Sequence, residues 1–281
     1  MNKNLLGIDF EDWYHPQLVQ PYVKSIKHEP KIFQGLEKII ELLRKTDTTA
    51  TFFMVGELLE HTPTMLDLIL DNDHEIAFHT MTHTNLNNLN KEKFLVELDD
   101  FAKITNGKSI GFRAPTFSIN PNTSWVIDAL IEKNYSYDSS IVPVKTQLYG
   151  FSNCQKSPFK ISSSSLTQND SNAKLLEFPL AVGTFFTKKI PISGGFYLRV
   201  LPLKNSISSI KNYESQNIPA TIYVHSWELT PEYIPKFHLP MKENFITFHN
   251  IKKTFSRLET ILRTFKFCSV EKYMKNNHDN S

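Results

Sequence analysis

Short apolar runs alternate with longer segments of helical periodicity along this 281-residue chain, and this alternation restricts the possible folds more than any other feature. We expect strands at the apolar runs, which are residues 5–8, 50–56, 75–78, 110–112, 135–137, 175–178 and 220–224. We expect helices where apolar residues recur at helical spacing, which are residues 31–45, 65–70, 94–105, 122–133, 203–215 and 251–265. Strand–helix–strand connections build parallel sheets with right-handed crossovers. About seven such units predict an α/β fold, a distorted (β/α) barrel of about seven parallel strands rather than an open doubly wound sheet.

The length of the chain suits one domain, because barrels of this size commonly form a single folding unit. We therefore predict one domain over residues 1–281. An irregular stretch rich in Pro, His and Tyr follows the first strand, to about residue 30. A polar segment at about 145–173 is predicted to be a long functional loop. The tail after residue 274 is polar, and we expect it to be frayed.

Composition excludes several classes of function. The formal net charge is +2 with interspersed signs, so we expect no nucleic-acid partner. The two cysteines, Cys154 and Cys268, have neither metal-binding nor redox spacing. No glycine-rich nucleotide motif follows a strand. No apolar run is long enough for a transmembrane segment or a signal peptide, so we expect a cytoplasmic protein, including one that works at the inner face of the membrane.

A histidine pair follows the strand expected at residues 75–78. His79 and His83 lie four positions apart, and on one helical turn their Cβ atoms would be about 5–6 Å apart. That separation allows two imidazoles to bind one metal ion. Taken alone, the pair is also compatible with a polar turn whose histidines bond to the backbone or to water.

Polar residues also follow the other expected strands. In a parallel barrel the carboxyl ends of the strands share one rim, where active sites are built. Each residue has a simpler explanation when taken singly, such as a turn, a surface ion pair or a buried histidine with hydrogen-bond partners. Their repeated position after strands favours a common site. The residues, in chain order, are Asp9, Glu11, Asp12, His79, His83, Arg113, Asp138 and His225.

This set of side chains indicates metal-assisted hydrolysis. Two histidines and one carboxylate, with a position left open for water, form a known catalytic zinc arrangement. The metal lowers the pKa of that water towards about 7. A second carboxylate can act as general base, and a further histidine can protonate a leaving amine. The chain has no Gly-x-Ser-x-Gly motif, so attack by water on an amide or ester fits better than an acyl-enzyme.

Six segments, in this order, resemble the motifs of polysaccharide deacetylases, the NodB-homology group of carbohydrate esterase family four. The opening Gly7-Ile-Asp-Phe-Glu-Asp-Trp-Tyr-His15 is most similar to the subgroup found with exopolysaccharide and exosortase-linked gene clusters. The resemblance covers roughly residues 5–270. The other segments are Thr51-Phe-Phe-Met-Val-Gly56, residues 74–83, Gly111-Phe-Arg-Ala-Pro-Thr-Phe-Ser118, Tyr137-Asp-Ser-Ser140 and Tyr223-Val-His-Ser-Trp-Glu228.

The resemblance implies a divalent metal, usually zinc, and removal of N-acetyl groups from N-acetylhexosamine residues, or sometimes of O-acetyl groups. By position, Asp9 resembles the family's base and His225 its general acid. A backbone N–H near Thr116 would help to stabilise the oxyanion. The remaining positions implied by the resemblance are His79 and His83 as metal ligands, Arg113 as the residue that orients the base, and Asp138 as a supporting aspartate.

The chain departs from the family pattern at two points. The common opening has adjacent aspartates, whereas here Glu11 and Asp12 follow Asp9 after an intervening Phe10. An extended strand would point Asp9 and Glu11 to the same side, which favours Glu11 as the carboxylate ligand, whereas a turn at Phe10 would bring in Asp12. The second departure is Tyr223, where the pattern has a leucine that lines the pocket for the acetyl methyl group.

The resemblance predicts a metal-dependent hydrolase whose partner is an N-acetylated glycan, either a polysaccharide or its biosynthetic precursor. Aromatic residues near the motifs can stack on a sugar ring, although core packing is the better explanation for any one of them. We assign substrate contacts to Thr116, Phe117, Trp227 and Tyr223. Two alternatives remain: a metal-independent amidohydrolase acting on a small cyclic amide, and a glycan-binding protein without catalysis.

Overall fold

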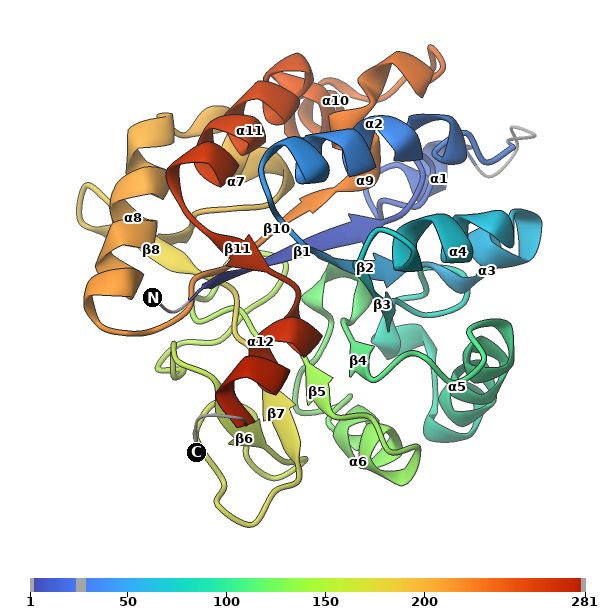
Figure 1. Ribbon diagram of the computed structural model, residues 1–281, viewed down its shortest axis with the longest axis vertical. Helices are drawn as coiled ribbons and strands as arrows, with labels where there is room; N and C mark the ends of the chain where they lie inside the picture. The colour runs from blue at the N-terminus through green and yellow to red at the C-terminus, as the bar shows by residue number, and fades with distance from the viewer. Residues whose placement is uncertain (1–2, 24–28, 279–281) are drawn as a thin grey trace.

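The computed structural model describes residues 3–23 and 29–278, and a curled sheet forms its centre (Figure 1). The strands of this sheet are arranged in the order β10-β1-β2-β3-β4-β5-β7-β6, and β11 pairs with β1. Residues 24–28, in the expected irregular stretch, and 279–281, in the expected frayed tail, lie outside the described residues. The strands that match the predicted runs are β1 (Asn4–Phe10), β2 (Thr51–Met54), β3 (Glu75–Phe78), β4 (Gly111–Phe112), β5 (Tyr137–Asp138), β7 (Leu175–Glu177) and β10 (Thr221–His225).

These strands form a barrel, which confirms the predicted fold. Neighbouring strands from β10 through β7 are parallel. The chain just after β7 closes the ring against β10, because Leu180 and Thr221 form a parallel bridge and the Ala181 N–H donates to the Thr221 carbonyl at 2.8 Å. Two-residue strands at β4 and β5 make the barrel distorted.

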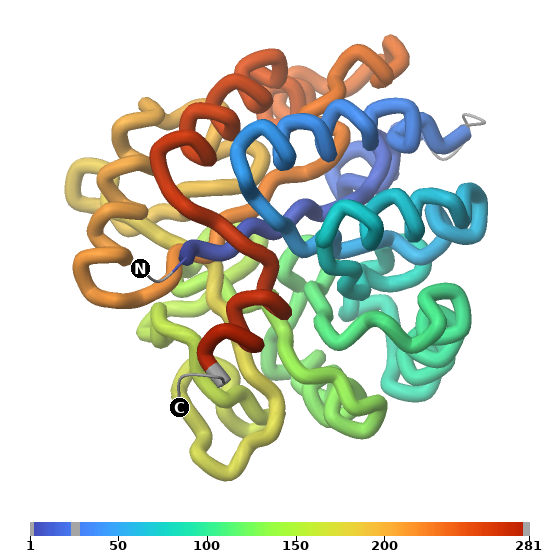
Figure 2. The backbone as a smooth tube through the Cα atoms, in the orientation of Figure 1, coloured from blue at the N-terminus to red at the C-terminus, as the bar shows by residue number. Residues whose placement is uncertain are grey.

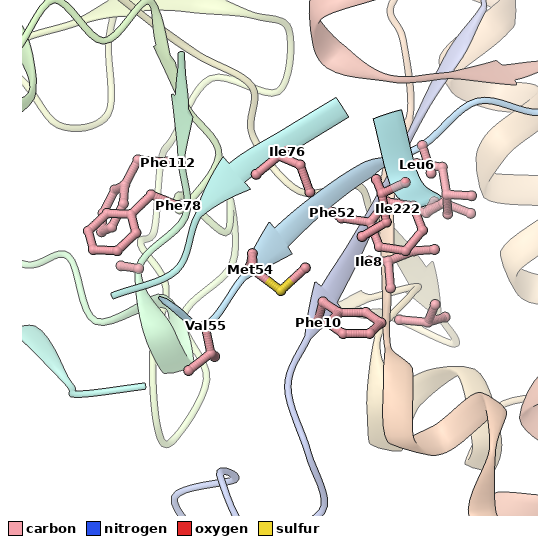
Figure 3. Close-up of a cluster of buried hydrophobic side chains, with 14 of the residues drawn as sticks. Leu6, Ile8, Phe10, Phe52, Met54, Val55, Ile76, Phe78, Phe112 and Ile222 are labelled. Carbon is pink, nitrogen blue, oxygen red and sulfur yellow. The ribbon is translucent and has the colours of Figure 1, made fainter. Parts of the chain in front are cut away.

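Helices lie around the outside of the barrel (Figures 1 and 2). Their apolar stripes pack against the outward side chains of the strands, among which Ile8, Phe10 and Phe52 are fully buried (Figure 3). Side chains alternate along a strand, so the intervening residues, including Asp9, face the barrel interior. The helices that match predicted segments are α2 (Phe33–Lys45), α4 (Thr64–Leu70), α5 (Lys91–Ile104), α6 (Trp125–Glu132), α8 (Leu203–Ser215) and α11 (Thr254–Thr264).

Several short elements were not predicted. The polar segment at 145–173 contains β6 (Phe159–Ile161), which pairs antiparallel with β7. The hairpin of β8 (Val182–Phe185) and β9 (Lys188–Pro191) and strand β11 (Phe267–Cys268) are equally short. The unpredicted helices are α1 (Gln20–Val23), α3 (Gly56–His61), α7 (Gly195–Val200), α9 (Ser226–Leu229) and α10 (Met241–Phe248), and 3-10 turns lie at Leu86–Asn88, Pro115–Phe117, Pro231–Tyr233 and Ile251–Lys253.

The C-terminal segment differs from the expected frayed tail. Helix α12 (Val270–His278) continues past residue 274. An ion pair of 2.7 Å between Lys275 and Glu271, four positions apart, stabilises this last stretch of helix. Cys154 and Cys268 are free thiols. Within the described ranges, every helix is too short or too polar to cross a lipid bilayer.

Candidate active site

Polar side chains meet at the carboxyl-end rim of the barrel, as the positions after the strands predicted. Glu11, His79 and His83 offer ligand atoms that all lie within 4.8 Å of one another, and all three residues are buried. The Glu11 Oε2 atom lies 2.6 Å from His83 Nε2. Two imidazoles and one carboxylate in this arrangement match the donor set of a catalytic zinc site.

His79 is oriented as a metal ligand would be. Its Nδ1 lies 2.7 Å from the carbonyl oxygen of Arg113, which can only accept, so Nδ1 has the proton and Nε2 has a free lone pair. Burial lowers the pKa of His79 to about 4, and the imidazole is therefore neutral at pH 7. A neutral imidazole is the form that binds a metal ion.

The segment that holds both histidines is not the helical turn that we predicted from their spacing. Residues 79–83 form an irregular bend, in which Thr80 and His83 have left-handed φ angles of 60° and 55°. The bend is fixed to the start of α3, because the N–H groups of Gly56 and Glu57 donate to the carbonyls of Thr80 and Met81. The two imidazole rings lie 5.0 Å apart between centroids.

Asp12, the alternative carboxylate, lies outside this group. Its Oδ1 accepts the N–H of Trp13 at 2.7 Å, and its Oδ2 accepts the N–H groups of Lys31 and Ile32. These bonds tie the loop after β1 to the segment before α2. Because backbone donors already occupy the Asp12 carboxylate, Glu11 is the acidic residue that faces the histidines.

Arg113 fixes Asp9 inside the barrel. The guanidinium is fully buried and donates from Nη1 to Asp9 Oδ1 at 2.6 Å. Nε donates to the carbonyl of Ser139 at 2.8 Å, and Nη2 donates to its hydroxyl at 2.9 Å. The Cζ atom of the guanidinium lies 3.8 Å from the centre of the Phe53 ring. A Cβ atom at position 7 would lie 2.6 Å from Arg113 Nη1, so Gly7 leaves the space that this side chain occupies.

His225 is oriented by a residue that the sequence analysis did not single out. Its Nδ1 lies 2.8 Å from Glu228 Oε2, and Glu228 Oε1 accepts from Arg199 Nε at 2.8 Å. The ring stacks on Trp227 at 5.6 Å and an interplanar angle of 18°. Its Nε2 faces Glu11, 3.8 Å from Oε1.

Charge around His225 favours the protonated imidazole. Burial alone lowers its pKa, but the carboxylates of Glu228 and Glu11 reverse that effect and raise the pKa to about 9. The pKa of Glu11 is shifted in the opposite direction. Burial raises its pKa, whereas His83, His225 and His79 hold the pKa well below the usual range. The rim therefore combines a carboxylate, a neutral imidazole and a protonated imidazole.

Asp138, predicted as a supporting aspartate, does not contact His225. Its Oδ1 accepts from Ser140 Oγ at 2.5 Å, and Glu177 is its register partner on the neighbouring strand β7. Burial raises the pKa of both carboxyls, and the charge of Asp138 raises the pKa of Glu177 further. The sequence signal for Glu228 was its position three residues after His225, at the start of α9, where its Oε2 also accepts the His225 backbone N–H at 3.3 Å.

The predicted substrate contacts form walls of the site. The Phe117 ring packs edge-on against Tyr223 at 5.0 Å, and Tyr223 packs against His225 at 5.5 Å. Trp227 Nε1 donates to Glu11 Oε1 at 2.9 Å. These three rings are at most 6% exposed, so they position the polar residues and leave little free face for a sugar. Thr116 has a φ of 55° on the turn beside them.

Comparison with known proteins shows which families two parts of the chain resemble. A family profile described as polysaccharide deacetylase matches residues 31–133, which include His79, His83 and Arg113. Residues 31–133 are therefore similar to the polysaccharide deacetylase family. A second profile, a domain of unknown function (DUF3473), matches residues 139–275, which include His225 and Glu228.

Individual relatives match shorter parts of the chain. A peptidoglycan-N-acetylglucosamine deacetylase of Bacillus cereus is 35% identical over 66 residues, which span 24% of this chain and 31% of that protein. A peptidoglycan deacetylase of Helicobacter pylori is 25% identical over 112 residues, or 38% of this chain and 37% of that protein. The matched segments therefore span about a third of these relatives.

Solved structures share the fold. A Mycobacterium smegmatis structure assigned as a polysaccharide deacetylase has a TM-score of 0.57 at 13% identity, and the match covers 100% of this chain and 92% of that chain. A 4-alpha-glucanotransferase from Thermococcus litoralis has a TM-score of 0.53, also at 13% identity, over 97% of this chain and 40% of that chain. Because the second structure has a different activity, the fold alone does not define the reaction. The reaction has to be inferred from the residues of the site.

Proposed function

We propose that this protein is a metal-dependent hydrolase that removes N-acetyl groups from N-acetylhexosamine residues of a polysaccharide or of its biosynthetic precursor. The main support is the buried group of Glu11, His79 and His83, with Asp9 and His225 beside it. The deacetylase profile and the relatives named as peptidoglycan deacetylases support the substrate class. The DUF3473 match supports placement in the exopolysaccharide-linked subgroup.

Glu11, His79 and His83 would hold one divalent cation, and their nitrogen and oxygen donors suit zinc. When bound, such a cation polarises the acetyl carbonyl and lowers the pKa of a water molecule. The orientation of His79 by the Arg113 carbonyl suits a metal ligand, since the second ring nitrogen of a ligating histidine commonly donates to a carbonyl or carboxylate.

Asp9 acts as general base in this proposal. Arg113 binds one of its oxygens, which fixes the orientation of the carboxylate, and the part of the chain that the structure describes places no hydrogen-bond donor on the other oxygen. That oxygen accepts a proton from the attacking water while the water oxygen bonds to the acetyl carbonyl carbon. General-base catalysis of this kind contributes roughly 10²–10⁴-fold.

His225 acts as general acid. Glu228 accepts the hydrogen bond from Nδ1, so the Nε2–H of the protonated ring points at the site. As the carbon–nitrogen bond breaks, Nε2 donates its proton to the departing amine, and the products are acetate and a free hexosamine. A pKa of about 9 keeps His225 protonated at neutral pH before the reaction.

The test is acetate release from N-acetylglucosamine oligomers by metal-loaded, chelated and reloaded protein. We expect release with the loaded protein, loss on chelation and recovery on reloading. Acetylated xylan serves as a second substrate that separates ester from amide cleavage. Acetate release that survives complete removal of metal would contradict the proposed mechanism. The proposed function would be wrong if the protein released no acetate with zinc, cobalt, manganese or nickel.

A further inference from the structure

A small pocket lies on the same rim as the candidate active site. Its lining comes from loops that follow the carboxyl ends of β3, β4 and β5, the edge of the barrel where Glu11 and the histidines meet. The lining residues on which the proposal rests are Asn85, Asn87, Thr116, Phe117, Lys145 and Tyr149.

Aromatic contacts connect this pocket to the candidate active site. Phe117 forms part of the pocket wall and packs against both Tyr149, at 5.1 Å, and Tyr223, at 5.0 Å. Tyr223 in turn contacts His225 at 5.5 Å between ring centroids. A group bound in the pocket would therefore lie two ring contacts away from the proposed acid, within reach of a neighbouring part of the same substrate.

The pocket presents hydrogen-bond donors that the described residues leave unused. Lys145 Nζ has no carboxylate partner within residues 3–23 and 29–278, and it is exposed. The same ranges contain no hydrogen-bond partner for Asn85 Nδ2 or the Thr116 hydroxyl. The amide oxygens are occupied, since Asn85 Oδ1 accepts from Asn87 and Asn87 Oδ1 accepts from Asn120.

The charge of the lining favours an anion. Lys145 is a cation, and no aspartate or glutamate is among the described lining residues. A set of donors with one positive charge and no acidic neighbour binds carboxylate or phosphate oxygens better than it binds neutral hydroxyl groups.

The size of the pocket narrows the ligand further. It encloses about 120 Å³, whereas pockets that bury a drug-sized ligand usually enclose about 300–1,000 Å³. One charged substituent fits such a space better than a second sugar ring. We propose that this pocket binds an anionic substituent, a carboxylate or a phosphate, on the sugar next to the acetylated residue. This proposal rests on the proposed deacetylase function, because it names the glycan as one with acidic substituents.

Binding can be measured without catalysis. Glucuronic acid, glucose 1-phosphate and neutral glucose are titrated into the whole protein, and the side-chain amide signals of Asn85 and Asn87 are followed by NMR. We expect one or both anionic sugars to bind at least about threefold more tightly than glucose, with a preference that weakens in high salt. The Lys145→Gln variant should lose the preference. Lys108→Gln is the control, because it changes an exposed lysine that precedes β4, at the opposite end of the barrel. This variant should keep the preference for anionic sugars.

Activity distinguishes the two sources of the anion and separates this proposal from the proposed function. N-acetylglucosamine linked to glucuronic acid, the same disaccharide with the carboxyl reduced, and a phosphate-linked equivalent are compared by kcat/KM. If one acidic substrate is preferred by the wild type and the preference disappears in Lys145→Gln, the acidic group of that substrate is the one that the pocket binds. Equal values for all three substrates, or equal affinity for the three sugars, would overturn the anion pocket while leaving the deacetylase intact. Absence of acetate release from every substrate would instead contradict the proposed function. The sugar titration alone would then test whether the pocket binds an anion.

Discussion

Asp9 and His225 are register partners at the end of the β1–β10 ladder. Paired positions on neighbouring parallel strands point to the same face of a sheet, so both side chains face the barrel interior. The proposed base and acid are thus positioned by backbone hydrogen bonds between two adjacent strands. Side chains on strands are held more precisely than side chains on loops, and catalytic groups benefit from that precision.

The first prediction concerns the base. Asp9→Asn keeps the shape of the side chain but removes its basicity, so we expect kcat to fall about 10²–10⁴-fold. The metal content should stay the same, because Asp9 is not in the ligand group. Asp47→Asn is the matched control, since Asp47 is 92% exposed and its ion pair with Lys266, at 3.5 Å, is also exposed. Unchanged kcat in Asp9→Asn would exclude Asp9 as the base.

The second prediction separates the two carboxylates of the opening motif. Glu11→Gln should lower metal affinity, measured by elemental analysis after dialysis, because it removes the anionic ligand of the group. Asp12→Asn should retain the metal and lower the free energy of unfolding by about 1–2 kcal/mol, because it weakens bonds to buried backbone N–H groups. The reverse pattern, with metal lost only in Asp12→Asn, would make Asp12 the ligand.

The third prediction concerns the orientation of His225. Glu228→Gln should lower kcat about 10- to 100-fold with little change in KM, because the Nδ1 hydrogen bond to a carboxylate is lost. The signal of the Nδ1 proton should shift in the NMR spectrum, a change that a general loss of stability would not produce. Asp138→Asn is the comparison, and should leave that signal and kcat nearly unchanged. If Asp138→Asn had the larger effect, the supporting role implied by the family resemblance would belong to Asp138.

The fold was predictable because the apolar runs have the lengths and positions of barrel strands. β6, the β8–β9 hairpin, α7 and α9 were not, since elements of three to six residues are too short to show a period. The position of the site was predictable for the same reason as the fold: strand ends of a barrel meet at one rim. The expectation that His79 and His83 lie on a helical turn failed because tertiary hydrogen bonds from α3 hold the segment in a bend.

Other details of the site depend on contacts between distant parts of the chain. The choice between Glu11 and Asp12 depends on bonds that Asp12 makes to residues 31 and 32. The partner of Asp138 is Glu177, which follows a loop of more than thirty residues and is its neighbour only through the β5–β7 pairing. Arg199 contacts Glu228 from α7, a helix that the sequence pattern did not predict. A single sequence contains no signal for such pairings.

The fourth prediction concerns stability and pH. Burial raises the pKa of Glu75 to about 7, despite hydrogen bonds with Thr51, Tyr137 and the Glu271 N–H that lower it. The folded state therefore favours the protonated acid. This contribution to stability is fully present below the unfolded pKa of 4.5 and is lost as the pH rises towards about 7.

Glu75→Gln should remove this dependence, because glutamine stays neutral at every pH. We expect the free energy of unfolding of the wild type, relative to the variant, to fall by about 1–3 kcal/mol between pH 4.5 and pH 8. Urea unfolding at several pH values in chelating buffer measures the difference. Glu37→Gln, at an exposed position on α2, should follow the wild type. Parallel stability curves for wild type and Glu75→Gln would contradict the assignment.

We propose above all that His83 belongs to a metal site on which deacetylation depends. The most direct test measures bound metal and acetate release in the same samples of wild type and His83→Ala, with thermal unfolding to confirm that both are folded. We expect about one metal ion per wild-type chain with acetate release, and loss of both in the folded variant. Metal content and acetate release that are unchanged in His83→Ala would contradict this proposal.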